Sequence, residues 1–129
     1  MKYFLALILM LFNFACAIEW VNLQSAKGKT IALDKDSIKE YQGYYFYNVK
    51  MYTNGLDDIV ITMQCRISHP FCARIKHCKS SEYDEMDGNY TRITDEPSKN
   101  LEPITYESRA YAAYKKVKEL TEVKPKITF

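Results

Sequence analysis

The sequence predicts an α+β domain, with an antiparallel β-sheet of about five or six strands in meander order and one C-terminal α-helix packed on it. Three observations predict this class. Apolar and polar residues alternate strictly from Ile59 to Ser68, which is the period of a half-buried antiparallel strand. Asn54-Gly55, just before that strand, is a strong hairpin signal. After Pro103 the apolar residues recur every three or four positions, as in an amphipathic helix.

The chain begins with a segment that resembles a secretory signal peptide. Lys2 supplies a positive charge, residues 3–14 are almost wholly apolar, and Ala15-Cys16-Ala17 is a small-residue cleavage site. We therefore expect residues 1–17 to be removed, which leaves a single exported domain, residues 18–129, in a compartment that permits disulfides. The periplasm and the cell surface both fit this expectation.

Membrane attachment is not expected. The apolar run is short for a spanning helix, and nothing later approaches the roughly 20 apolar residues that such a helix needs. Acylation of Cys16 is left open, although Asn13 stands where a lipoprotein signal usually has an aliphatic residue.

Composition excludes one class of partner and favours another. The net charge of +2 is far from the basic excess of a dedicated nucleic-acid binder, so no nucleic acid is expected. The chain has 11 tyrosines and 1 tryptophan, and tyrosine is favoured on half-buried strands and at interfaces. The composition therefore indicates a β-rich binding domain.

The other strands follow from residue type and turn signals. Ser25-Ala26-Lys27-Gly28 is a glycine-containing hairpin connection, and Ser68-His69-Pro70 is a second turn. The segments predicted as strands, in addition to the alternating one, are Trp20–Leu23, Thr30–Leu33, Tyr44–Thr53, Phe71–Cys78 and a short piece at Tyr90–Thr94.

The helix is predicted from Thr105 or Ser108 to Leu120, and either hydroxyl side chain suits the N-cap. Lysines in the last turn suit the negative end of the helix dipole, and Pro125 prevents easy continuation. The residues on the apolar stripe are Ala110, Ala113, Tyr114, Val117 and Thr121.

The expected domain has three cysteines, which allows one intramolecular disulfide. If the hairpin connection is the four residues 67–70, Cys65 lies opposite Cys72; with a three-residue loop it faces Ala73 instead. We favour a Cys65–Cys72 bond with Cys78 unpaired.

Metal binding and catalysis have little support. His69, Cys72, His77 and Cys78 do not follow paired zinc spacings, and an oxidising compartment removes thiolates. The two histidines are better explained as a turn residue and a strand-end residue. The acidic residues of the 82–87 segment do not match the calcium-loop order and are expected in a solvated loop: Glu82, Asp84, Glu85 and Asp87. No catalytic residue, metal or cofactor is predicted, and a small enzyme is the third alternative for function.

Two surfaces are candidates for partner binding. Arg66, Arg74 and Lys76 should project from one sheet face, although a charged outer face also explains them. In the aromatic strand, one face should be core, and it carries Tyr45, Tyr47, Val49 and Met51. The other face also has Asn48 and is either covered by the protein or exposed as a platform; its candidate partner-binding residues are Tyr44, Phe46, Lys50 and Tyr52.

The order of features resembles the bacterial surface-adhesin protein E family, small exported domains with an antiparallel sheet and a C-terminal helix. The resemblance spans residues 18–120. It depends on these residues: Glu19-Trp20-Val21, Leu33-Asp34, Asp36-Ser37-Ile38, Gly43, Phe71-Cys72, Arg74, Lys76, Tyr83, Glu102-Pro103-Ile104 and Ser108. Members commonly have a cysteine near the C-terminal helix, and this chain has none there, so that bridge is not carried over.

The resemblance implies attachment to a host matrix or serum protein and supplies no catalytic residues. A periplasmic module that binds a protein or inhibits an enzyme is the first alternative. A dimer is left open.

Overall fold

The computed structural model describes residues 18–52, 57–85 and 97–122. Its elements are β1 (Trp20–Gln24), β2 (Thr30–Asp34), the 3₁₀ turn η1 (Lys35–Ser37), β3 (Lys39–Tyr41), β4 (Tyr44–Met51), β5 (Ile59–Arg66), β6 (Phe71–Lys79), α2 (Ser80–Glu85), β7 (Glu102–Pro103) and α3 (Arg109–Glu122). Several predictions lie outside the described residues: the signal peptide with Cys16, the strand end at Thr53, the Asn54-Gly55 turn, Asp87, the Tyr90–Thr94 strand and the role of Pro125.

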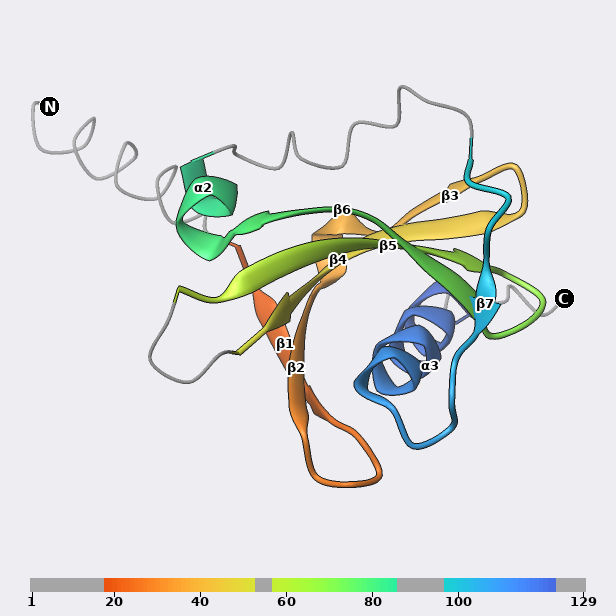
Figure 1. Ribbon diagram of the computed structural model, residues 1–129, viewed down its shortest axis with the longest axis horizontal. Coiled ribbons are helices and arrows are strands. Elements are labelled where there is room, and N and C mark those ends of the chain that lie inside the picture. The colour runs from red at the N-terminus through yellow and green to blue at the C-terminus, as the bar shows by residue number, and fades with distance from the viewer. Residues whose placement is uncertain (1–17, 53–56, 86–96, 123–129) are drawn as a thin grey trace, which may run out of the picture.

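The described strands form one seven-stranded antiparallel sheet in the order β1-β2-β4-β5-β6-β7, with β3 also paired to β4. With the long C-terminal helix α3, this confirms the predicted α+β class (Figure 1). The strands β3 and β7 were not predicted. They have three and two exposed residues, which is too short for an alternating apolar pattern to show.

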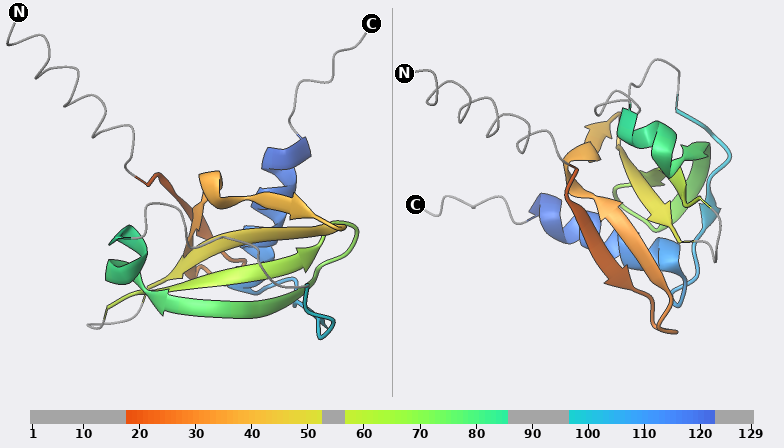
Figure 2. Two further views of the ribbon diagram at one scale, coloured as in Figure 1. Left: turned by 90° about the horizontal axis from the view of Figure 1, so that it is seen from above. Right: turned by 90° about the vertical axis from the view of Figure 1, so that its left-hand side faces the viewer.

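The long helix packs on one face of the sheet, and α2 lies on the opposite side, at the end of β6 (Figures 1 and 2). The core beneath α3 is built from alternate residues of the central strands together with the apolar stripe of the helix. Its buried members include Leu33, Tyr45, Tyr47, Val49, Met63, Ala113, Tyr114 and Val117.

The helix begins where the sequence predicted, with Ser108 as its cap. The backbone N–H of Tyr111 donates to Ser108 Oγ at 3.1 Å, so Ser108, and not Thr105, is the capping hydroxyl. The helix continues to Glu122, two residues past the predicted end at Leu120. In the part of the chain that the structure describes, no helix is long and apolar enough to cross a bilayer.

The prediction that β5 is half-buried is wrong, because both of its faces are buried. On the face away from α3, Val60 packs with Tyr83 of α2 and with Trp20. At the other end of that face, the Gln64 side chain pairs with the backbone of Ser98 through bonds of 3.1 and 2.9 Å. A central strand therefore needs cover on both sides, which the alternation of its own residues does not reveal.

The acidic segment after β6 is a helix as far as Glu85, so the prediction of a loop is wrong, although Glu82 and Asp84 are exposed to solvent as expected. Tyr83 is the reason: its side chain is 1% exposed and turns inward from α2 onto the sheet. Its hydroxyl donates to the carboxylate of Asp34 and accepts from Asn48 Nδ2 at 3.0 Å. Asn48 Oδ1 accepts in turn from Thr62 Oγ1 at 2.5 Å. This buried network fastens α2 to three strands.

Candidate binding site

The predicted aromatic platform on β4 is largely covered by the protein itself. Phe46 is 2% exposed, so no partner reaches it in this conformation. The Lys50 ammonium lies 4.3 Å from the ring centroid of Trp20, an intramolecular cation–π contact. Tyr44 is half-buried, and Tyr52 is 43% exposed with its hydroxyl donating to Asn22 Oδ1 at 2.9 Å. The four residues therefore do not form one continuous contact surface.

The three basic residues expected on one sheet face are divided between two faces. The register between β5 and β6 shifts at Thr62/Met63, so that Lys76 pairs with Thr62 while Arg74 pairs with Met63. Such a bulge moves the following side chains to the opposite face. The structure thereby corrects the predicted grouping: Lys76 shares the Thr62 face, and Arg74 lies on the α3 side with Met63.

A cleft of about 420 Å³ lies between the sheet and the start of α3. Ala110 and Ala113 face it from the helix, and their small side chains leave space that Tyr114 and Val117 fill further along. The floor of the cleft is apolar and comes from β2, β4 and β5: Ile31, Val49, Met51, Ile61 and Met63.

The rim of this cleft is cationic. Lys27 and Lys29 come from the β1–β2 connection, which extends beside α3 (Figure 1), while Arg74 comes from β6 and Arg109 opens α3. Glu107 is the acidic residue of the lining, and its carboxylate is 3.3 Å from Lys27 Nζ. With four cations and one carboxylate, the rim of the cleft is positively charged, and it surrounds an apolar floor.

A second hollow of about 650 Å³ continues the first along the edge of β6, beneath the segment from Ser98 to Thr105. The two hollows share five lining residues: Met63, Arg74, Thr105, Ser108 and Ala110. They therefore form one elongated depression, which we call the α3 groove.

An exposed aromatic side chain, Tyr106, lies next to this groove. Tyr106 is 71% exposed, the highest value among the exposed large hydrophobic residues of the described chain. Its ring centroid is 4.9 Å from that of Tyr111, the third residue of α3. Thr105 and Glu107, on either side of Tyr106, both line the groove. Tyr106 was not predicted as a site residue, because a lone tyrosine in a loop carries no pattern.

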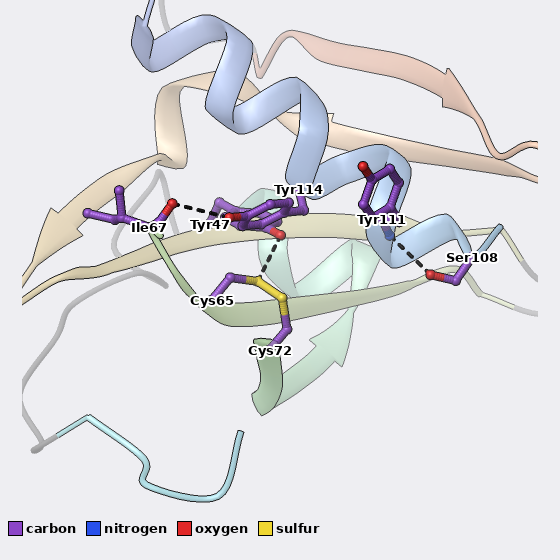
Figure 3. The surroundings of a disulfide bond; sticks show 7 residues. All are labelled: Tyr47, Cys65, Ile67, Cys72, Ser108, Tyr111 and Tyr114. Atoms are coloured by element: carbon purple, nitrogen blue, oxygen red, sulfur yellow. Dashed lines mark hydrogen bonds between the residues drawn. A yellow bond between two sulfur atoms is a disulfide. The ribbon is translucent and has the colours of Figure 1, made fainter. Parts of the chain in front are cut away.

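A disulfide between Cys65 and Cys72 joins β5 to β6 beside the groove, as the four-residue connection predicted (Figure 3). Tyr47 donates from its hydroxyl to Cys65 Sγ at 3.1 Å, since a disulfide sulfur has no proton to give. Burial raises the pKa of Tyr47 far above its ordinary value, so it remains a donor.

The same hairpin also holds the helix. The Tyr114 hydroxyl donates to the carbonyl oxygen of Ile67 at 3.2 Å, which links α3 to the end of β5 (Figure 3). Cys72 lines the second hollow, so the disulfide holds the β6 side of the groove. The Tyr114 bond holds α3, which forms the helix side of the groove.

The histidines and the third cysteine lie away from this groove. His69 is exposed in the β5–β6 turn with Nδ1 2.7 Å from Ser68 Oγ, and His77 is exposed on β6. Cys78 is half-buried and is not in the disulfide. Within the described ranges, no three side chains of the metal-ligating types come together.

Comparison of the chain with protein-family models, with curated proteins and with solved structures gives no match.

Proposed function

We propose that the protein is an exported, non-catalytic protein-binding module that attaches to a host matrix or serum protein, as the resemblance to the surface-adhesin protein E family implies. The observation that supports this best is the exposed side chain of Tyr106 beside the groove, in ring contact with the half-buried Tyr111. Tyrosine supplies a large contact area at low entropy cost, so a few such residues dominate many interfaces.

Two further features support export. The sequence before residue 18 has the pattern of a signal peptide. The Cys65–Cys72 disulfide is of a kind that persists in oxidising compartments such as the periplasm or the cell surface.

The proposal is tested by binding of residues 18–129, with the disulfide intact, to immobilised purified matrix and serum proteins. We expect saturable binding to at least one of them. Tyr106→Ser should weaken it by about tenfold, as for an interface hot spot. The melting temperature should hardly change, because this side chain is mostly in solvent.

Tyr52→Ser is the matched variant, because Tyr52 is also an exposed tyrosine but belongs to the predicted β4 platform. Loss of binding in Tyr52→Ser and not in Tyr106→Ser would move the interface to β4 and contradict the assignment to the groove side. Binding only to proteins of a periplasmic extract would replace the adhesin-like function by that of a periplasmic binding or inhibitor module.

A further inference from the structure

We propose that the α3 groove binds an extended acidic segment of the partner protein, with apolar side chains of that segment in contact with the groove floor. The inference rests on the proposed binding function and adds the site and the chemistry of the ligand.

The floor defines the first requirement. Five apolar side chains from three adjacent strands line it, and the apolar side chains that face it from the helix are the alanines Ala110 and Ala113. An apolar side chain that enters this space removes its own apolar surface from water, which favours binding by roughly 25 cal/mol per Å² buried. The floor adds less, because its side chains other than Met51 are at most 7% exposed. A wholly charged or polar ligand would gain nothing from this floor.

The rim defines the second requirement. After the Lys27–Glu107 ion pair, the groove lining still carries the three cations Lys29, Arg74 and Arg109 against one further carboxylate, that of Glu102 in the second hollow. None of these three forms an ion pair with another described residue. The net charge of the entire chain is only +2, so the groove holds a local excess of positive charge and is complementary to carboxylates.

The shape selects a peptide over a compact molecule. The groove lining crosses from β2 through β4 and β5 to Arg74 of β6, which is about 14 Å at the usual spacing of neighbouring strands. An extended chain rises about 3.3 Å per residue, so about four or five residues cover that distance. Alternate side chains of such a segment point to opposite sides. The apolar side chains then face the floor, and the acidic side chains face the cationic rim.

A fluorescein-labelled six-residue peptide of alternating aspartate and leucine is a direct probe. Fluorescence anisotropy with residues 18–129 should show binding that is at least about tenfold tighter than that of the serine–leucine peptide of equal length. The lysine–leucine peptide should not bind measurably. Equal affinity for all three peptides would overturn the charge requirement.

Charge reversal then locates the site. Lys29→Glu combined with Arg74→Glu should weaken binding of the aspartate–leucine peptide by about tenfold or more. The matched control combines Lys79→Glu with Lys115→Glu, which changes the net charge equally at exposed positions outside the groove. An equal loss in both variants would reflect overall charge and would overturn the site.

Two outcomes separate this inference from the proposed function. If the groove reversal leaves matrix-protein binding unchanged, the groove assignment fails and the binding function stands. If the peptide binds as expected but no matrix, serum or periplasmic protein does, the adhesin-like function fails instead. Displacement of the peptide by dodecanoate at a lower concentration than by unlabelled peptide would assign the groove to a lipid-like anion and overturn the proposal.

Discussion

Substitution of Tyr83 tests whether its buried hydrogen bonds hold α2 on the sheet. Tyr83→Phe removes one hydroxyl and keeps the ring, so the ring contact with Trp20, at 5.5 Å between centroids, remains. No cavity of a methylene or more is created. The change therefore isolates the hydrogen bonds of the buried network from packing.

The expected cost follows from what the lost hydroxyl leaves behind. The Asp34 carboxylate, in a residue that is 5% exposed, loses a donor but retains the backbone N–H of Asp36 at 3.2 Å. Asn48 Nδ2, in a residue that is 0% exposed, loses its acceptor. A hydrogen bond to a charged group contributes about 1.5–3 kcal/mol, and an unsatisfied buried donor costs about 1–3 kcal/mol. Because these terms overlap, we expect Tyr83→Phe to lower the free energy of unfolding by about 2–3 kcal/mol.

Urea unfolding followed by tryptophan fluorescence measures this cost at the same place, because Trp20 is the single tryptophan of the chain and packs against Tyr83. The matched control is Tyr52→Phe, which removes the exposed hydrogen bond to Asn22 and should cost less than about 0.5 kcal/mol. Equal costs for the two variants, or a cost below about 0.5 kcal/mol for Tyr83→Phe, would refute the argument that the network holds α2 on the sheet.

Three further predictions concern the hairpin, the helix cap and alkaline pH. Replacing Cys65 and Cys72 together by alanine should lower the free energy of unfolding by about 2 kcal/mol, the value for so short a closed loop, and an unchanged urea midpoint would contradict this. Ser108→Ala should cost about 1 kcal/mol by loss of the N-cap, and the amide of Tyr111 should then exchange hydrogen faster than in the unmodified chain. Burial raises the pKa of Tyr47 and Tyr83, so the folded state holds these protons more tightly than the unfolded state, whose tyrosines titrate near about 10. Ionisation of these tyrosines should therefore not affect the melting temperature below about pH 9, and it should lower the melting temperature as the pH rises above about 10. The fall of melting temperature with pH should be less steep in Tyr83→Phe; an equally steep fall in that variant would contradict the raised pKa of Tyr83.

Local patterns in the sequence predicted much of the fold. The period of two in Ile59–Arg66 and the four-residue connection that follows set the register that places Cys65 opposite Cys72. The period of three and four residues, together with the hydroxyl of Ser108, predicted where α3 begins. Each of these features depends on residues within a few positions of one another, which is why a single sequence is sufficient to find it.

The candidate site was not predicted, because its parts come from distant segments. Lys29, Arg74 and Arg109 belong to a turn, a strand and a helix start, and only the packed sheet and helix bring them to one groove. The bulge opposite Thr62 also moved Arg74 away from Lys76, and no local residue signalled it.

The sequence by itself determined the fold class and the helix, and it favoured the Cys65–Cys72 register and a hydroxyl cap, since these follow from local periodicity, turn length and side-chain type. The structure then selected that register and chose Ser108 over Thr105. Only the tertiary structure decided which aromatic residues are accessible: Phe46 and Tyr83 are buried, while Tyr106 is in solvent. The physical reason is that burial depends on what long-range packing places over a side chain. On a central strand, alternation marks two faces but does not say which of them another segment covers.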